Sequence, residues 1–394
     1  MNMGESMDLV IVSGLAWDGL YLKSTVELAK QLARWHRVLF VEQAPSMAGS
    51  SPLLGSRLRQ VDAHGRLHVL RPAPEIPHNR LPPGAVHDLV MSVNRARLRR
   101  GVTAAVQELG FDDILLINAW NPVYGLELLP PDSVGATMYY CYDEIGGAFW
   151  KARHGARAER QVLASADAVV ATSPTLQDSK SELNSRCYLV PNGVDTPAFS
   201  RFREQGAQAD SSVRSLPGPI LGYLGCIDGR MDLTLVAEVA KQRPDWSIAL
   251  VGPVLRGATT DAVKGLDNVH LFGSIPPDRI PAVLAAFDVG IVPFVLDPFT
   301  RALYPLKMLD YLAAGLRMVT TGFAQIPELE PWSATARSPN EFVVAVELEL
   351  AAAGSDAVQR YAAADARSWE QRAVQLEQVL IRTLSFTRQQ RTSA

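Results

Sequence analysis

The sequence has little cysteine, little lysine and no long run of apolar residues. Its three cysteines, Cys141, Cys187 and Cys226, are far apart and odd in number, which predicts a reducing compartment and no disulfide framework. No apolar stretch reaches the length of about 18 residues that a membrane-spanning helix needs. The N-terminal residues MNMGESMDLVIVSG lack the charged and apolar regions of a signal peptide. We therefore expect a cytoplasmic protein.

Several motifs with well-defined chemistry are also missing. The sequence contains no GxGxxG, no P-loop GxxxxGK[ST], no GxSxG and no His/Cys cluster with zinc spacing. An NAD-dependent oxidoreductase is therefore the function class that the sequence supports least. The formal net charge of −3 gives no general attraction to nucleic acid. We expect no metal site and no bound cofactor.

The 394 residues are 47% hydrophobic and 20% charged, and short apolar runs alternate with helical patterns throughout. This alternation predicts an α/β fold with parallel sheets covered on both faces. A polar segment, FSRFREQGAQADSSVRSLPGP, interrupts it, and the alternation then starts again. We predict an N-terminal domain over 1–199, a linker over 200–218 and a C-terminal domain over 219–365. The terminal helix, 366–394, is expected to pack back on the first domain. The two doubly wound domains are expected to face each other across a ligand-binding cleft.

The segment YPLKMLDYLAAGLRMVTT, residues 304–321, predicts a mostly apolar helix followed by a strand. It carries Lys307, although the chain has only seven lysines against thirty-one arginines. Pro305 suits the first turn of a helix, and Gly315 suits its C-terminal cap. A helix N-terminus attracts anions, and Lys307 adds a full positive charge there. Asp310, one turn further on, can accept hydrogen bonds from hydroxyl groups such as those of ribose. The other interpretation is an ordinary Lys–Asp pair on a partly exposed helix.

Segments along almost the whole chain resemble, in the same order, those of bacterial GT-B glycosyltransferases, the group 1 enzymes of exopolysaccharide and teichuronic-acid type. TRALYPLKMLDYLAAG is similar to their nucleotide-sugar segment, and YYCYDEIGGAFW to their Y-x-C-x-D-[DE] segment. LVPNGVD, LGYLGCIDGRMDLTLVAEVAKQRPDWSIALVGP, DNVHLFGSIPPDRIPAVLAAFDVGIVPF and SWEQRAVQLEQVL also match stretches of these enzymes. The resemblance implies a GT-B fold with two Rossmann-like domains. It implies a nucleotide diphosphate-sugar as the donor substrate.

The donor-binding residues that the resemblance implies lie in the C-terminal domain. They are Gly225, Arg230, Thr300, Arg301, Pro305, Leu306, Lys307 and Asp310. Asp310 stands where the family usually has Glu. Ala302 occupies the position of a glutamate in a common version of the motif, and Cys226 replaces a common arginine. Arg230 is a candidate phosphate contact in its place, or a solvated residue at a helix start.

No two aspartates have D-x-D spacing, which argues against a metal-dependent glycosyltransferase. We therefore expect the departing diphosphate to be stabilised by the helix N-terminus and Lys307, with Arg230 and Arg301 as further contributors.

The acceptor is expected in the N-terminal domain. Asp143, after an apolar strand, is the predicted general base, with Glu144 as the alternative; Asp143 could instead cap the following helix. The loop GLAWDG supplies Gly14, Trp17 and Asp18 on the acceptor side, or it is simply a strand–helix turn.

A basic cluster, NRARLRRG, lies in a helical stretch and contains Arg95, Arg97, Arg99 and Arg100. Two interpretations are open: a solvated helix face, or peripheral contact with anionic lipid at the inner face of the membrane.

The sequence thus predicts a glycosyltransferase that moves a sugar from a nucleotide diphosphate donor to a hydroxyl group of a glycan, lipid-linked or small-molecule acceptor, without metal. Two alternatives are a nucleotide-sugar epimerase of the same fold and a non-catalytic nucleotide-binding partner of a transferase. The base, the sugar, the acceptor and the stereochemical outcome are not predicted.

Overall fold

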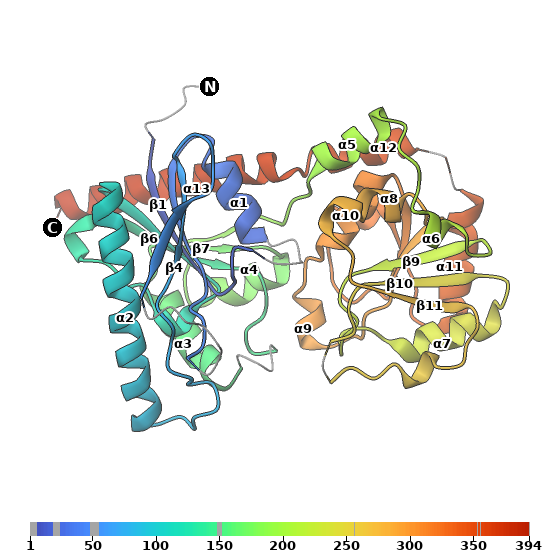
Figure 1. Ribbon diagram of the computed structural model, residues 1–394, viewed down its shortest axis with the longest axis horizontal. Coiled ribbons are helices and arrows are strands. Elements are labelled where there is room, and N and C mark those ends of the chain that lie inside the picture. The colour runs from blue at the N-terminus through green and yellow to red at the C-terminus, as the bar shows by residue number, and fades with distance from the viewer. Residues whose placement is uncertain are drawn as a thin grey trace. The chain divides into compact units, whose positions relative to one another are not determined.

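The computed structural model describes residues 6–18, 24–47, 55–147, 152–255, 257–352, 354 and 356–393. The chain forms two compact units (Figure 1). Unit 1 comprises Met1–Pro191 and Arg372–Ala394, and unit 2 comprises Asn192–Gln371. No helix within the described ranges is long and apolar enough to span a bilayer.

Unit 1 is built on an eight-stranded sheet in the order β3-β4-β2-β1-β5-β6-β7-β8. All neighbouring strands are parallel except β3 and β4. The strands are β1 Asp8–Ser13, β2 Arg37–Val41, β3 Arg57–Gln60, β4 Leu67–Arg71, β5 Ile114–Ala119, β6 Val134–Cys141, β7 Ala168–Ala171 and β8 Cys187–Leu189. The central strands are apolar along their whole length because both faces of the sheet are covered.

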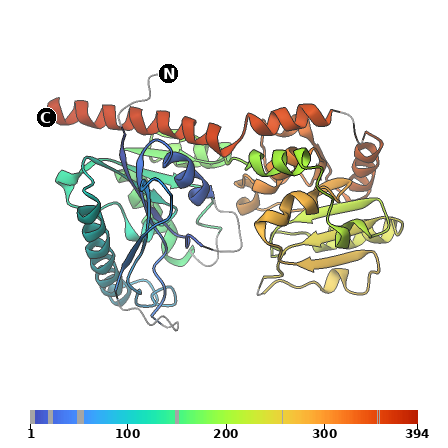
Figure 2. The same ribbon diagram turned by 45° about the horizontal axis from the view of Figure 1, so that its top comes forward.

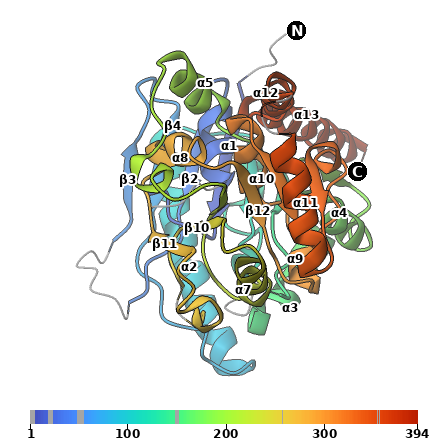
Figure 3. The same cartoon turned by 90° about the vertical axis from the view of Figure 1, so that its right-hand side faces the viewer.

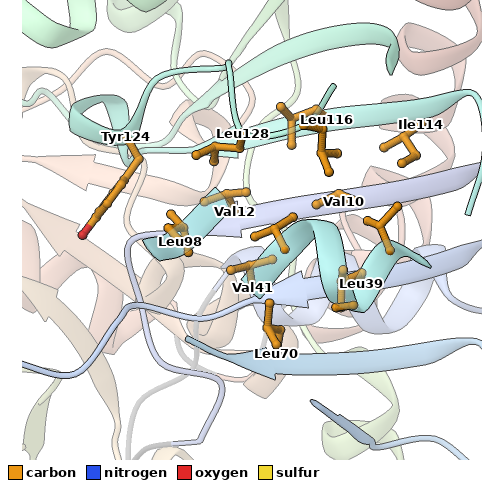
Figure 4. Close-up of a cluster of buried hydrophobic side chains, with 14 of the residues drawn as sticks. Val10, Val12, Leu39, Val41, Leu70, Leu98, Ile114, Leu116, Tyr124 and Leu128 are labelled. Carbon is orange, nitrogen blue, oxygen red and sulfur yellow. The ribbon is translucent and has the colours of Figure 1, made fainter. Parts of the chain in front are cut away.

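The helices of unit 1 are α1 Ser24–Leu32, α2 Ala85–Leu109, α3 Ala152–Ser165 and α4 Pro174–Ser181. Alternate residues of β1 and β2, including Val10 and Leu39, meet Leu98 of α2 in a buried cluster (Figure 4). Tyr124 belongs to the same cluster through its ring, while its hydroxyl points away from the other labelled side chains (Figure 4). This core fixes the carboxyl ends of the strands, where the loops of unit 1 emerge.

The last helix, α13 Trp369–Ser393, crosses the division between the units, and its residues from Arg372 onward pack with unit 1 (Figure 2). Its buried side chains include Leu376 and Leu380. The Arg391 guanidinium donates to the carbonyl oxygen of Val134 over 2.8 Å, and Arg388 forms an ion pair with Asp113. The C-terminus of the chain is therefore part of the N-terminal unit.

Unit 2 contains a six-stranded, fully parallel sheet in the order β11-β10-β9-β12-β13-β14. Its strands are β9 Ile220–Leu224, β10 Ser247–Val251, β11 Val269–Gly273, β12 Val289–Val292, β13 Arg317–Thr320 and β14 Ser333–Thr335. Its other helices are α5 Thr196–Glu204, α6 Ser211–Arg214, α7 Leu233–Gln242, α8 Ile280–Leu284, α9 Pro298–Arg301, α10 Leu306–Ala314, α11 Pro339–Ala351 and α12 Ala357–Asp365. Helices α7 and α11 contact each other, and α10 contacts α8 and α12 (Figure 3).

The units divide at other positions than those predicted from composition. Unit 2 begins at Asn192, whereas the linker was predicted over 200–218. Within that segment, the Arg203 guanidinium donates to the carbonyl oxygen of Ala313 over 2.7 Å and lies 3.9 Å from the centre of the Tyr361 ring. Val213 is buried in α6. The polar composition therefore reflects short helices that are bonded to unit 2.

Candidate functional site

Helix α10 is fixed to the sheet of unit 2 by Tyr311. The Tyr311 hydroxyl accepts a hydrogen bond from the backbone N–H of Leu224 at 3.1 Å, and it lies 3.2 Å from the carbonyl oxygen of Ile291. Gly315 ends the helix in the left-handed conformation, as the sequence predicted. The N-terminus of α10 therefore has a fixed position beside the carboxyl ends of β9 and β12.

Lys307 lies in this first turn and rests against two aromatic rings. Its Nζ is 3.8 Å from the centre of the Tyr223 ring and 4.6 Å from that of Phe294. Loss of hydration lowers the pKa of Lys307 well below its usual value, and the nearby Arg230 acts in the same direction. A cation in these surroundings gains more from an incoming anion than a hydrated surface lysine does.

Gly225, directly after β9, leaves space for this cation. Its φ is 133°, and a Cβ atom added to it would lie 2.8 Å from the Lys307 Nζ. A side chain at this position would therefore both strain the backbone and displace the ammonium group.

Arg230 is held in place by Asp228. Its guanidinium donates twice to Asp228, from Nε to Oδ1 over 2.9 Å and from Nη2 to Oδ2 over 2.6 Å. The Asp228 pKa is lowered overall, because hydrogen bonding and attraction from Arg230 outweigh the opposing effect of burial. Arg230 is therefore a positioned cation rather than a freely solvated residue.

Asp310 is buried, with 6% of its surface exposed. Burial, and then the negative charge of Asp195, raise its pKa to about 7, while Lys307 opposes the rise. Asp195 caps α5 by accepting the backbone N–H of Ala198 at 3.3 Å. Lys307 and Asp310 therefore do not form the surface pair that was the simpler interpretation of their spacing.

Replacing Asp310 with Asn should make unit 2 more stable at high pH. The folded pKa of about 7 lies above that of an unfolded aspartate, so folded Asp310 keeps its proton longer and the native state loses stability as pH rises toward 7. The variant lacks this loss, and its advantage should grow by roughly 2 kcal/mol between pH 5 and pH 8. Urea unfolding followed by tryptophan fluorescence at the two pH values measures it. The same substitution at exposed Asp278 is the control, and an advantage independent of pH would contradict the expectation.

The other predicted donor residues occupy different surroundings. Thr300 is fully buried, where its hydroxyl donates to the carbonyl oxygen of Val295 over 2.6 Å and its backbone N–H bonds Asp297 in a capping box. Thr300 therefore shapes the turn into α9 and does not present its side chain to a ligand, which corrects the prediction. Arg301 is exposed on α9. Pro305 is the residue before α10, and Leu306 is its first residue.

In unit 1, Asp143 lies just beyond β6, at the carboxyl edge of the sheet. The indole Nε1–H of Trp120 donates to its backbone carbonyl over 2.8 Å, which holds the position of the residue. Residues 144–147, which follow it, are not helical, and α3 is described from Ala152, so Asp143 does not cap that helix.

Glu144 is engaged in a buried ion-pair network. It accepts a hydrogen bond from Lys180 Nζ at 2.9 Å, and Lys180 also donates to Glu159 over 3.0 Å. Burial alone would lower the pKa of Lys180, but Cys141, Glu159 and Glu144 raise it above its usual value overall. The structure thus assigns Glu144 to the support of a buried lysine, which argues against its role as the alternative general base.

The three residues predicted for the acceptor side, in the loop after β1, have different surroundings. Gly14 lines a cavity of about 130 Å³ at the carboxyl ends of β1 and β5. Trp17 instead stacks edge-on against Phe40, with ring centres 5.0 Å apart, and does not line it. Asp18 is exposed and accepts from Arg59 over 2.7 Å. Gly19, the end of the predicted loop, lies outside the described residues.

The sequence did not single out the aromatic pair Tyr223 and Phe294, nor the acidic residues Asp228, Asp195 and Glu75. Asp228 and Asp195 occur inside segments that resemble the family, so the resemblance could have pointed to them as site residues. Phe294 likewise ends a segment that resembles the family, whereas nothing in the local pattern marks Glu75, which meets its partners only through residues distant in the sequence.

Comparisons with known proteins agree with this architecture. Residues 227–357 match the family of glycosyl transferases group 1. A segment of 216 residues is 29% identical to the putative teichuronic acid biosynthesis glycosyltransferase TuaH of Bacillus subtilis strain 168. This alignment covers 50% of the chain and 52% of TuaH, so the chain matches about half the length of that relative.

Solved structures match over nearly the whole chain. Sucrose-phosphate synthase from Thermosynechococcus elongatus has a TM-score of 0.70 at 17% identity, covering 96% of this chain and 99% of that one. HepE of Anabaena, in complex with UDP and glucose, has a TM-score of 0.61 at 16% identity, covering 95% and 99%. At these identities the likeness shows the fold. The chain therefore has the two-domain GT-B fold, and its residues 227–357 match the family of group 1 glycosyl transferases.

Proposed function

We propose that this protein is a glycosyltransferase that moves a sugar from a nucleotide diphosphate-sugar to a hydroxyl group of an acceptor, a glycan or a lipid-linked intermediate. The observation that carries the proposal is the cation cluster at the N-terminus of α10. There Lys307 and Arg230 are fixed within the part of the chain that matches group 1 glycosyl transferases.

The donor would bind to unit 2 through two kinds of contact. Lys307, Arg230 and the N-terminus of α10 are the groups for the diphosphate, because they combine full charges with the positive end of a helix. Asp310 is the group for ribose hydroxyls, since a carboxylate accepts hydrogen bonds from them. TuaH is named a glycosyltransferase, and HepE was solved with UDP and glucose, which makes UDP and UDP-glucose the first probes.

Bond cleavage transfers negative charge to the departing diphosphate. Lys307 and Arg230 are already positioned by Tyr223, Phe294 and Asp228, so they can stabilise this charge without reorganising. In unit 1, Asp143 would take the proton of the acceptor hydroxyl as the glycosidic bond forms. We propose that these charges suffice and that no metal ion is needed.

Binding of UDP should raise the melting temperature of the protein, and EDTA should leave this shift unchanged. At a UDP concentration 100-fold above Kd, mass action predicts a stabilisation of about 2.7 kcal/mol. A thermal-shift titration with UDP, and then with UDP-glucose, GDP and dTDP, in the presence and absence of EDTA, measures both effects.

Adenosine serves as the control, because it offers a ribose without a diphosphate. If no nucleoside diphosphate shifts the transition, the proposed donor site is wrong. A shift that EDTA abolishes and Mg²⁺ restores would contradict the metal-free part of the proposal. Release of UDP with formation of a new glycoside would separate a transferase from an epimerase or a non-catalytic partner.

We also propose that helix α2 brings the enzyme to an anionic membrane surface. Val86, Leu89 and Val93 are 65%, 67% and 41% exposed, and their i, i+3, i+7 spacing places them on one side of the helix. Arg100 continues the same stripe. An exposed apolar stripe that continues into basic residues is typical of helices that lie in the membrane interface.

The four arginines of the basic cluster differ in their surroundings. Arg99 and Arg100 are exposed, and Arg97 is half-buried. Arg95 donates to the carbonyl oxygen of Val123 from Nε over 3.0 Å and from Nη2 over 2.8 Å. Arg99 and Arg100 are therefore the charges with most freedom to meet lipid head groups.

Replacing Arg99 and Arg100 with Gln should weaken association with anionic vesicles by about 1 kcal/mol per charge. Replacing Val86, Leu89 and Val93 with Ser should weaken it further, because apolar area is then lost from the interface. Co-sedimentation with vesicles containing phosphatidylglycerol measures both. The matched control changes the exposed Val344 and Leu348 of α11 to Ser. Equal sedimentation of all variants would leave α2 as a solvated face.

A further inference from the structure

The turn that leads into α10 is held by two side chains from distant parts of unit 2. Tyr304, the residue before Pro305, is buried. Its carbonyl oxygen accepts a hydrogen bond from the side-chain amide of Asn192 at 2.9 Å, and its hydroxyl donates to the carboxylate of Glu328. The sequence singled out neither Asn192 nor Glu328 as a site residue, and the proposed donor contacts do not include them.

The bond from Asn192 sets the direction in which α10 begins. The Tyr304 carbonyl belongs to the planar peptide that joins this residue to Pro305. The Pro305 ring fixes the next rotation, with φ at −71°, and the backbone N–H of Met308 donates to the Pro305 carbonyl over 3.2 Å. Little rotational freedom therefore separates the Asn192 amide from the turn that carries Lys307.

Asn192 is itself fixed by its neighbours in the chain. The backbone N–H of Val194 donates to the carbonyl oxygen of Arg367 over 3.1 Å, and the Val194 carbonyl accepts from the N–H of Trp369 at 3.1 Å. A Cβ atom added to Gly193 would lie 2.9 Å from Trp369, so the two segments are in close contact. The position of the Asn192 amide therefore depends on backbone pairing within unit 2.

Glu328 is anchored by the same segment. Arg367 Nε lies 3.2 Å from a carboxylate oxygen of Glu328, and Arg367 Nη2 donates to the backbone carbonyl of Glu328 over 2.7 Å. The same guanidinium donates from Nη1 to the carbonyl oxygen of Ala363 over 2.8 Å. The side chain of Arg367 thus holds Glu328, while its backbone pairs beside Asn192. A closed ring of contacts therefore fixes Tyr304.

We propose that Asn192 and Glu328, with Arg367 behind them, position the diphosphate site of unit 2. By holding the turn before α10, they keep the N–H groups of its first turn ready for the incoming phosphates. The inference rests on the proposed function and adds to it the residues that preorganise the anion site. A turn that is ordered before the donor arrives loses less conformational freedom on binding.

The effect should be confined to the phosphates. Helix ends fray readily, so the first turn of α10 depends on the bonds that flank it. Asp310, the proposed ribose contact, lies one turn further on and next to Tyr311, whose hydroxyl anchors the helix to Leu224 of the sheet. Loosening the turn before α10 should therefore weaken binding of the diphosphate and leave binding of the nucleoside unchanged.

Ligand-detected NMR on the full chain tests the proposal with UDP and uridine, which differ only by the diphosphate. Tyr304→Phe removes the hydroxyl that bonds Glu328, and Asn192→Ala removes the amide that bonds the Tyr304 carbonyl. Each variant should bind UDP about three- to tenfold more weakly and bind uridine as the wild type does. Tyr361→Phe makes the same change beside the C-terminal end of α10, where the ring packs on Arg203, and should leave both affinities unaltered.

Variants of Glu328 separate positioning from a general loss of stability. Glu328→Ala should weaken UDP as Tyr304→Phe does, and the double variant should bind UDP no more weakly than Glu328→Ala alone, because both changes break the same bond. Glu328→Gln keeps an oxygen that accepts from the Tyr304 hydroxyl and should restore most of the affinity. Circular dichroism at the temperature of the NMR experiment checks that each variant is folded.

If the wild type binds UDP and Tyr304→Phe binds it equally well, the inference is wrong and the proposed donor site stands. A loss of uridine affinity equal to the loss of UDP affinity also overturns it, because the defect then extends beyond the diphosphate site. If no nucleoside diphosphate binds the wild type, the proposed function is wrong and the inference falls with it. If GDP or dTDP is the nucleotide that stabilises the wild type, it and its nucleoside replace UDP and uridine. Tyr304→Phe removes a single oxygen atom, so it decides the question even if Asn192→Ala does not fold.

Discussion

Replacing Asp143 with Asn should lower kcat by about 10²- to 10⁴-fold, the usual contribution of a positioned general base. An acceptor hydroxyl is a poor nucleophile at neutral pH, and an amide cannot take its proton. Asp143 lies beyond the carboxyl end of β6, with its backbone carbonyl fixed by the indole of Trp120. The affinity for UDP should hardly change, because the donor is assigned to unit 2. Steady-state kinetics with the native acceptor, together with UDP titration, measure both effects.

Two control variants accompany this measurement. Asp132→Asn makes the same chemical change at an exposed position of unit 1 and should leave kcat unaltered. Glu144→Gln should instead lower thermal stability, because the buried Lys180 then keeps only one of its two carboxylate partners. If Asp143→Asn keeps more than about half of the wild-type kcat, Asp143 is not the general base.

The size of the loss also bears on stereochemistry. A direct displacement that inverts the sugar needs a base on the acceptor side. A retaining reaction can instead let the departing phosphate take the proton. A loss greater than about a hundredfold therefore favours inversion, and a smaller one favours retention. Proton NMR of the new glycosidic bond gives the configuration independently.

Replacing Lys307 with Met should lower kcat/KM by a factor that corresponds to a loss of about 1.5 to 3 kcal/mol in transition-state stabilisation. This is the range for a hydrogen bond to a charged group. Met keeps an apolar stem against Tyr223 and Phe294 and removes only the charge. The loss of hydration that lowers the pKa of Lys307 also costs the folded protein stability, so the variant should be as stable as the wild type or slightly more stable. Activity should thus fall while the melting temperature does not.

Lys241→Met, on the exposed part of α7, is the matched control and should behave like the wild type. Full activity of Lys307→Met would show that the lysine serves only to pack against the two rings. A parallel loss of activity and stability would point to the same structural role. The proposed role in holding the leaving group requires the loss of kcat/KM without the loss of stability.

The alternation of strands and helices in the two units was predictable because it depends on neighbours in the chain. Apolar runs such as those of β1 and β9 indicate buried parallel strands, and Gly315 predicts the end of α10, since these signals depend on local periodicity and backbone conformation. Local composition failed over 200–218, where polar residues form short helices packed on unit 2. Composition reports exposure, and an exposed helix is as polar as a linker.

The position of Lys307 in the first turn of α10 was likewise determined by the sequence, because a proline before an apolar helical pattern locates a helix start. The environment of that lysine was decided only by the tertiary structure, which brings Tyr223 from β9 and Phe294 from beyond β12 against its ammonium group. Two other contacts were also decided only by the tertiary structure. Lys180 meets Glu144 across 36 residues of the sequence, and Tyr124 meets Glu75 across 49. The order of the strands in the sheet decides which residues meet across such distances. Local periodicity predicts each strand but does not determine that order.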